Sequence, residues 1–227
     1  MSKKRRARRA VSPAGDERKV VHLVMYNITT EPVRDRQYKK LTRRVRDMIE
    51  QFHDQVQNQP RKAIPGLLEW IEKYPHVPQF YNYLYVAYAA TGQRAKMKAA
   101  ALDNYRRNPD YLFARLNYAE VLLGRRDYDR VAEVFESKFD LKLLYPKRDT
   151  FHITEVVGFM LVVGQYFIGI GQCDVAIKYY EVLEQIAPGS RQTRQLRREL
   201  RRELQRERWR NAHSILVRRL VRWLRGR

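Results

Sequence analysis

Histidines are the side chains of this chain best suited to metal binding or acid–base catalysis, and there are five. No two lie four residues apart, so no pair shares one face of a helix as zinc ligands do. His53 is followed directly by Asp54 in a segment that we predict to be helical, where neighbouring side chains point about 100° apart. We therefore expect no catalytic histidine–carboxylate pair. The five histidines are His22, His53, His76, His152 and His213.

The single cysteine and a group of glycines have structural explanations. Cys173 precedes a predicted helix, whose N-terminus could lower its pKa, but a small, half-buried turn residue is the simpler interpretation. Gly164, Gly169 and Gly171 lie in an apolar helical stretch, where close packing and a turn explain them better than a phosphate-binding loop. One cysteine excludes an internal disulfide and a multi-cysteine metal site. We predict a non-enzymatic protein with no cofactor, no metal and no small-molecule substrate.

A cluster of aromatic residues in the middle of the chain leaves two interpretations. The cluster could form a platform for stacking nucleic-acid bases. Its helical spacing favours packing between helices instead. The members are Phe80, Tyr81, Tyr83, Tyr85 and Tyr88.

Charge is concentrated at the two ends of the chain, whose formal net charge is +21. Residues 1–46 hold 15 basic and 4 acidic side chains, residues 47–188 hold 17 and 18, and residues 189–227 hold 14 and 3. No apolar segment follows the basic run at residues 3–9, so it is not typical of a secretory signal. The apolar window at 156–170 is about one turn too short to span a membrane. We expect a cytoplasmic protein, with association to a membrane surface or to nucleic acid left open.

The near-neutral middle of the chain repeats itself. Pro75 and Pro109 both end apolar helical stretches and lie 34 residues apart. The same spacing separates Ala63, Met97 and Val131, after which the register shifts by 11 residues and then resumes at Ala176. Apolar residues follow the 3.6-residue helical period in paired segments, and Gly92 and Gly171 lie between the segments, where tight turns need glycine. Each pair buries one face, so neighbouring pairs must stack.

These residues resemble the tetratricopeptide repeat, whose 34-residue pattern has an aromatic residue, Leu-Gly and Tyr in the first helix, then Ala and Phe, then Pro. The match covers residues 78–111, 112–145 and 157–190, and the second half of 44–77. The small residues Ala63, Ala119, Gly164 and Ala176 are expected where paired helices approach closely. The resemblance implies an all-α fold, a right-handed α-solenoid of antiparallel helix pairs. A different helical repeat or an ordinary bundle is the alternative.

We predict three regions. Residues 1–33 form a basic, partly disordered or extended segment, in which the β-branched stretch 19–33 could be a strand that lacks an evident partner. Residues 34–190 form the repeat domain, beginning with a helix at 34–57 and carrying an insertion near 139–154. Residues 191–227 form an Arg-rich amphipathic helix with Leu196, Leu200 and Leu204 along one stripe.

Three roles compete for this C-terminal helix. Its leucine stripe could cover the last repeat as a cap. Its second half has tryptophan and leucine among arginines, which suits an anionic membrane or the phosphates of nucleic acid. The candidate polyanion-binding residues at both ends of the chain are Arg5, Arg6, Arg218, Arg219, Arg222 and Arg225.

The resemblance also implies a binding surface. In that family the first helices of the pairs line a concave groove that receives a peptide or a helix of another protein. Carried over by register, the predicted groove residues are Asn82, Val86, Phe113, Leu116, Glu120, Leu161 and Gln165. Their mainly apolar character favours an apolar peptide or amphipathic helix as the partner. The insertion or the N-terminal segment could instead cover some of them, and the chain could act chiefly through its basic ends.

Overall fold

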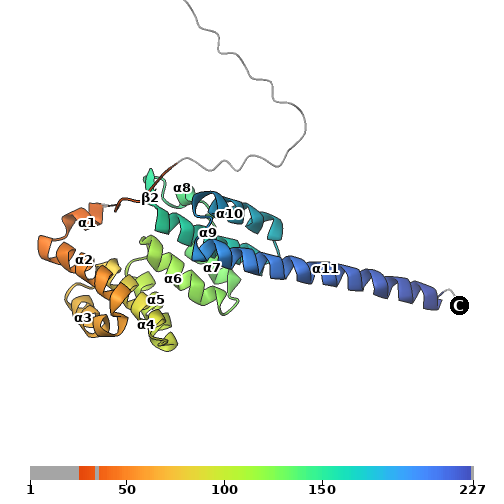
Figure 1. Cartoon of the computed structure of the whole chain (residues 1–227), viewed down its shortest axis with the longest axis horizontal. Coiled ribbons are helices and arrows are strands. Elements are labelled where there is room, and N and C mark those ends of the chain that lie inside the picture. Colours follow the sequence, from red (N-terminus) through yellow and green to blue (C-terminus); the bar gives the residue numbers. More distant parts are fainter. Residues whose placement is uncertain (1–25, 34–35, 226–227) are drawn as a thin grey trace, which may run out of the picture.

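The structure is a computed structural model that describes residues 26–33 and 36–225, with the backbone alone for residues 36, 37 and 211–225. The described residues are mostly helical, so the prediction of an all-α chain is confirmed at this level. Eleven helices and two short strands occur within the described residues. Four pairs of consecutive helices pack against each other along the chain: α2 with α3, α4 with α5, α6 with α7, and α9 with α10 (Figure 1).

The helices are α1 (Arg36–Lys40), α2 (Arg43–Asn58), α3 (Pro60–Lys73), α4 (Pro78–Ala90), α5 (Arg94–Arg107), α6 (Leu112–Leu123), α7 (Tyr128–Val134), α8 (Leu141–Leu144), α9 (Ile153–Gly169), α10 (Cys173–Ile186) and α11 (Arg191–Arg225). The strands are β1 (Asn27–Thr29) and β2 (Thr150–His152).

Local sequence sets the turns inside the pairs. Gly92 and Gly171 have φ of 74° and 79°, in the left-handed region that the sequence predicted for these glycines. Arg126 occupies the same place between α6 and α7 with φ 59°. The helix predicted at 34–57 is divided, because the Thr42 side chain accepts a hydrogen bond from the backbone N–H of Val45 at 3.4 Å and caps the start of α2.

The predicted insertion contains α8 and β2, and it supplies the partner that the sequence did not reveal for the N-terminal strand. β1 and β2 pair in parallel, with Ile28 opposite Phe151. Tyr26, directly before β1, packs edge-on against Phe151 with 5.0 Å between ring centroids. Residues 27–29 therefore form the strand that the sequence left open, with β2 as its partner, while residues 19–25 lie outside the described part of the chain.

The core is divided between two clusters. One joins α2, α3 and α4 around Phe52, Leu67 and Phe80, and the other joins α6, α7, α9 and α10 around Phe135 and Phe159. Ala63, Ala119 and Ala176 have no exposed surface, as expected for close helix contacts. Gly164 differs, because its close neighbour belongs to the C-terminal helix: an added Cβ would lie 2.7 Å from Leu196 Cδ2.

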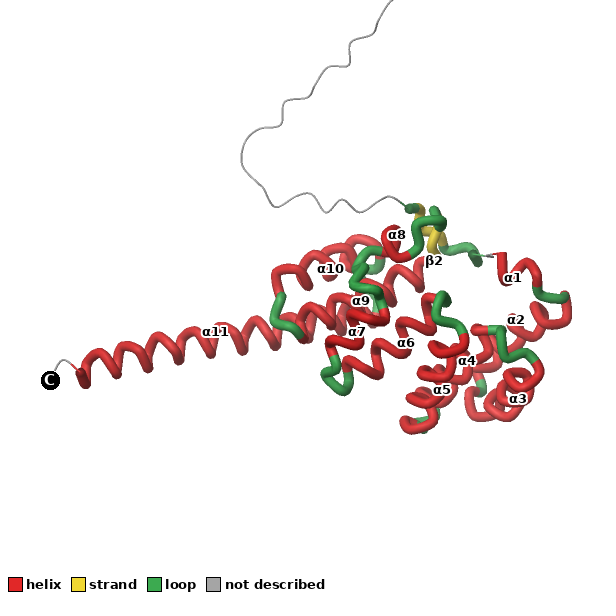
Figure 2. Tube along the Cα trace, turned by 180° about the vertical axis from the view of Figure 1, so that it is seen from behind, coloured by secondary structure: helices red, strands yellow, loops and turns green. Residues whose placement is uncertain are grey.

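The C-terminal helix α11 begins on the body and then leaves it. Leu196 and Leu200 are buried where α11 packs on α9 and α10. Farther along, the helix projects beyond the other elements (Figures 1 and 2), and the Trp209 side chain is 78% exposed. Among the described residues, no helix combines the length and apolar character that a membrane span requires.

Candidate functional site

A cavity of about 730 Å³ opens among α2, the first turns of α4, α6 and α9, and the insertion. This volume lies within the range of ligand-binding clefts. Pro32 and Val33, which follow β1, line it as well. Residues far apart in the sequence therefore meet here because β1 pairs with β2 and holds the segment before α1 against the insertion. We call this cavity the cleft.

Aromatic rings provide much of the lining of the cleft. Tyr83 comes from α4, Tyr111 and Phe113 from the start of α6, and Tyr145 from the insertion. Burial raises the pKa of Tyr83 and of Tyr145 above the ordinary value, and the Arg115 and Arg148 guanidinium groups oppose only part of the rise at Tyr145. Both phenols therefore stay neutral at physiological pH. Two buried polar atoms of residues that line the cleft, Gln79 Oε1 and Tyr145 OH, have no hydrogen-bond partner among the described residues.

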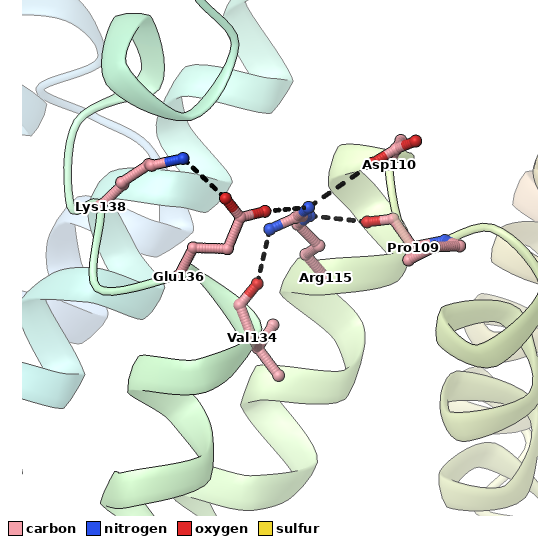
Figure 3. Close-up of polar contacts among 6 residues, drawn as sticks. All are labelled: Pro109, Asp110, Arg115, Val134, Glu136 and Lys138. Atoms are coloured by element: carbon pink, nitrogen blue, oxygen red, sulfur yellow. Dashed lines mark hydrogen bonds and ion pairs between the residues drawn. The ribbon is translucent and has the colours of Figure 1, made fainter.

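Arg115 holds one wall of the cleft in place (Figure 3). Its side chain is 7% exposed, and its guanidinium donates to Pro109 O at 2.6 Å and to Val134 O at 2.7 Å. It also binds Glu136 Oε1 at 2.8 Å. These contacts tie the loop before α6 to the end of α7, as a buried cation requires. Arg115 stands at the aromatic position of the repeat pattern, and its significance there was missed from the sequence.

The backbone after α7 is unusual where it meets Arg115. Glu136 and Ser137 have φ of 54° and 53°, a conformation that residues other than glycine rarely adopt. Glu136 also accepts a hydrogen bond from Lys138 at 2.7 Å. The bonds from Lys138 and then Arg115 hold the pKa of the Glu136 carboxyl below its usual value, so it stays ionised.

A second arginine, Arg148, is held on the insertion. It makes a two-pronged contact with the Glu155 carboxylate, at 3.0 and 2.7 Å. Its guanidinium also lies 4.2 Å from the centroid of Phe151. The Glu155 carboxylate in turn accepts the His152 backbone N–H at 2.9 Å, which caps α9. Arg148 therefore fixes the insertion against the start of α9, and sequence reasoning did not identify this role.

The acidic residues of the cleft outnumber its arginines. Five carboxylates and two guanidinium groups line it. Asp54 and Asp110 have side chains that are 81% and 89% exposed. Asp54 Oδ1 lies 3.1 Å from His53 Nδ1, so these adjacent side chains meet at the helix surface although they start about 100° apart. The five acidic residues are Glu50, Asp54, Asp110, Glu136 and Glu155.

Of the seven predicted groove residues, Phe113 is the one that lines the cleft. Val86 on α4 is 39% exposed outside it. Three others form hydrogen bonds between helices, two of them between α4 and α6 and one between α9 and α11. These bonds run from Asn117 Nδ2 to Asn82 Oδ1 at 2.9 Å, from Tyr85 OH to Glu120 Oε2 at 2.7 Å, and from Gln165 Nε2 to the Glu199 carboxylate at 3.0 Å.

Leu116 and Leu161 do not face a groove, which corrects the prediction for both. They are 3% and 5% exposed and belong to the core between α6 and α9. The physical reason is Gly158, where an added Cβ would lie 3.1 Å from Leu116 Cδ1. This glycine lets α9 approach α6 closely enough to cover Leu116, while Leu161 on α9 is buried in the same core cluster.

The remaining candidate residues contribute no described side chain to the cleft. Arg5 and Arg6 lie outside the described residues. Arg218, Arg219, Arg222 and Arg225 lie in the part of α11 that is described by its backbone alone. Cys173 is the first residue of α10 and is buried; burial, then the Glu207 carboxylate, raises its pKa to about 11.

No group of three or more potential metal ligands occurs among the described residues. No family model, no curated protein and no solved structure matches the chain.

Proposed function

We propose that this chain is a non-enzymatic protein-interaction scaffold built on tetratricopeptide-like repeats, which binds a peptide or helix of a partner protein. The observation that carries the proposal is the cleft of about 730 Å³ on the first-helix side of the pairs. Ile49, Leu112 and Phe113 give it apolar lining. A partially apolar cleft between helices suits the side chains of an inserted peptide better than a flat surface does.

Two features support the repeat arrangement. The turns inside three pairs each place one residue in the left-handed region, at Gly92, Arg126 and Gly171. Two hydrogen bonds between α4 and α6 join residues 35 positions apart, and one between α9 and α11 joins residues 34 positions apart. This spacing equals the sequence period within one residue. The bond from Gln165 to Glu199 therefore supports the proposal that α11 acts as a further first helix.

A selection experiment tests the interaction role. A random peptide library is displayed and selected on the full chain, and the enriched peptides are then measured against the Phe113→Ser variant. We expect enriched peptides that lose at least tenfold in affinity for this variant, because Phe113 lines the cleft. The matched control is Leu68→Ser on α3, which removes another exposed apolar side chain, 47% exposed, outside the cleft. Equal binding to both variants, or no enrichment, would contradict the proposal.

A second candidate function rests on α11. Its first 20 residues, 191–210, hold nine arginines and three glutamates, and the helix carries the exposed Trp209. We propose contact with a polyanion as the alternative role of this helix. Binding of a labelled RNA to the full chain should then weaken by orders of magnitude between 50 and 200 mM salt. Changing Arg201, Arg202 and Arg208 to glutamine should reduce the slope, and salt-independent binding would contradict this role.

A further inference from the structure

The two arginines in the cleft are already committed to contacts within the chain. Arg115 uses its Nε, Nη1 and Nη2 atoms on Pro109, Val134 and Glu136. Arg148 uses both of its terminal nitrogens on Glu155. An anionic ligand would therefore have to break these contacts to reach a guanidinium, at the cost of leaving a buried charge unpaired. The cleft is poorly suited to a phosphate or a carboxylate.

The carboxylates are not committed to the same degree. Glu136 and Glu155 neutralise the two arginines, but Asp54 and Asp110 are largely exposed. Asp110 lies 3.7 Å from Arg115 Nη2, beyond hydrogen-bond distance, and that nitrogen already binds Glu136. The partner of Asp54 is the His53 ring. A cation entering the cleft would meet carboxylates that can accept new hydrogen bonds.

The rest of the lining is also suited to a hydrogen-bond donor with a positive charge. Tyr83, Tyr111 and Phe113 supply aromatic rings, whose faces attract cations by about 0.5–2 kcal/mol each when the cation is desolvated. The ring of Tyr145 already has the Arg148 guanidinium 5.6 Å from its centroid. The chain shows the same chemistry nearby, where Arg148 stacks on Phe151. Gln79 Oε1 is an acceptor without a partner among the described residues.

We propose that the cleft binds a basic peptide segment of a partner protein, with a lysine or arginine side chain among the tyrosine rings and facing Asp54 and Asp110. This inference rests on the proposed peptide-binding function and specifies its partner. Charge complementarity selects the occupant. The excess of carboxylates, the aromatic rings and the Gln79 acceptor, which has no partner among the described residues, favour a cation. Both guanidinium groups already have partners within the chain, so an anion is disfavoured. The cavity is large enough to hold a short segment rather than a single ion.

Fluorescence anisotropy with the full chain tests the charge preference. The probe is a labelled peptide with two arginines flanking a leucine, and its matched control replaces both arginines with citrulline, which keeps the shape and loses the charge. We expect the arginine peptide to bind at least tenfold more tightly at 50 mM salt. The double variant Asp54→Asn, Asp110→Asn should reduce its affinity about tenfold and leave citrulline-peptide binding unchanged. Asp129→Asn with Glu181→Gln removes the same charge outside the cleft and should change neither.

Three results would overturn the proposal. The first is equal affinity for the two peptides; if Phe113→Ser then weakens both, the peptide-binding function stands and the charge preference alone fails. The second is an equal loss in the double variant and in its control, which would indicate a diffuse field rather than a site. The third concerns the chain's own basic residues. If changing the six basic residues at positions 3–9 to glutamine in the full chain strengthens peptide binding tenfold, the occupant is that segment and not a partner.

Discussion

Replacement of Arg115 by methionine tests how the cleft wall is held together. Methionine keeps much of the length and apolar volume of the arginine stem but removes every donor. Two backbone carbonyls, Pro109 O and Val134 O, then lose bonds of 2.6 and 2.7 Å. Each hydrogen bond from a charged donor contributes about 1.5–3 kcal/mol. The Glu136 carboxylate loses less, because it stays half exposed and keeps Lys138 as a partner. We expect a loss of about 3–4 kcal/mol in the free energy of unfolding.

Urea unfolding measures this loss. With a slope of about 2 kcal/mol per molar, the midpoint should fall by about 1.5–2 M. Circular dichroism and tryptophan fluorescence should be followed together, since stacked helix pairs can unfold in more than one step. Arg115→Lys should lie between wild type and methionine, because an ammonium cannot reach three acceptors in the planar arrangement of a guanidinium.

The matched control is Arg107→Met on α5, where the arginine pairs with Asp103 at 2.9 Å and both side chains are about half exposed. This change should leave the midpoint almost unmoved, because an exposed ion pair is screened by water. A loss of less than about 1 kcal/mol for Arg115→Met, or equal losses for the two variants, would refute the reasoning.

Three further predictions follow from buried groups. The pKa of Cys173 is raised from 9.0 to about 11, so fewer of its thiols are ionised at pH 8. The folded chain should therefore react with a disulfide reagent about 100-fold more slowly than the chain unfolded in urea. Glu207→Gln should speed the reaction of the folded chain, because the Glu207 carboxylate contributes to the raised pKa. Burial, then Asp140, raises the Tyr26 pKa from 10.0 to about 12. The neutral phenol therefore stabilises the fold below pH 10, and this contribution is lost as the pH rises towards 12. The urea midpoint should fall over this pH range, and Tyr26→Phe should make the fall smaller. Gly164→Ala should destabilise the α9–α11 contact, and Leu196→Ala should reduce that penalty in a double-mutant cycle; additive losses would contradict this coupling.

The predictable parts of the fold are those that local sequence determines. A glycine between two apolar helical stretches indicates a left-handed turn residue, and Gly92 and Gly171 adopt that conformation. The pairing of β1 with β2 has no such signal, because three-residue strands far apart in the sequence carry too few residues for a pattern. The division at Thr42 was missed because a threonine can either continue a helix or cap the start of a new one. The helical period of the apolar residues is unbroken around Thr42, so it does not show which of the two occurs.

The candidate site was predictable to a smaller extent. Phe113 was identified from its register, whereas Leu116 and Leu161 were assigned to a groove although both are buried, Leu116 by the close approach of α9 at Gly158. The register of the repeat assigns a residue to one face of its helix but does not give the distance of that face from the next helix. The burial of the two leucines therefore could not be predicted from the register. Arg115 was visible only as a charged residue at an aromatic position, because two of its acceptors are backbone carbonyls, which carry no sequence signal.

The departures from the 34-residue pattern meet at one place. The insertion interrupts the period, and it brings Tyr145 and Arg148 to the cleft. Arg115 replaces an aromatic residue, and it holds the cleft wall through the end of α7, where Glu136 has positive φ. Substitutions that were merely tolerated would be scattered over the helix pairs. Arg126, with positive φ between α6 and α7, lies outside the cleft. The insertion, Arg115 and Glu136 nevertheless gather around one cavity, as is common at functional sites, where a sequence departs from its own pattern to place particular groups. These residues therefore direct the search for function to the cleft.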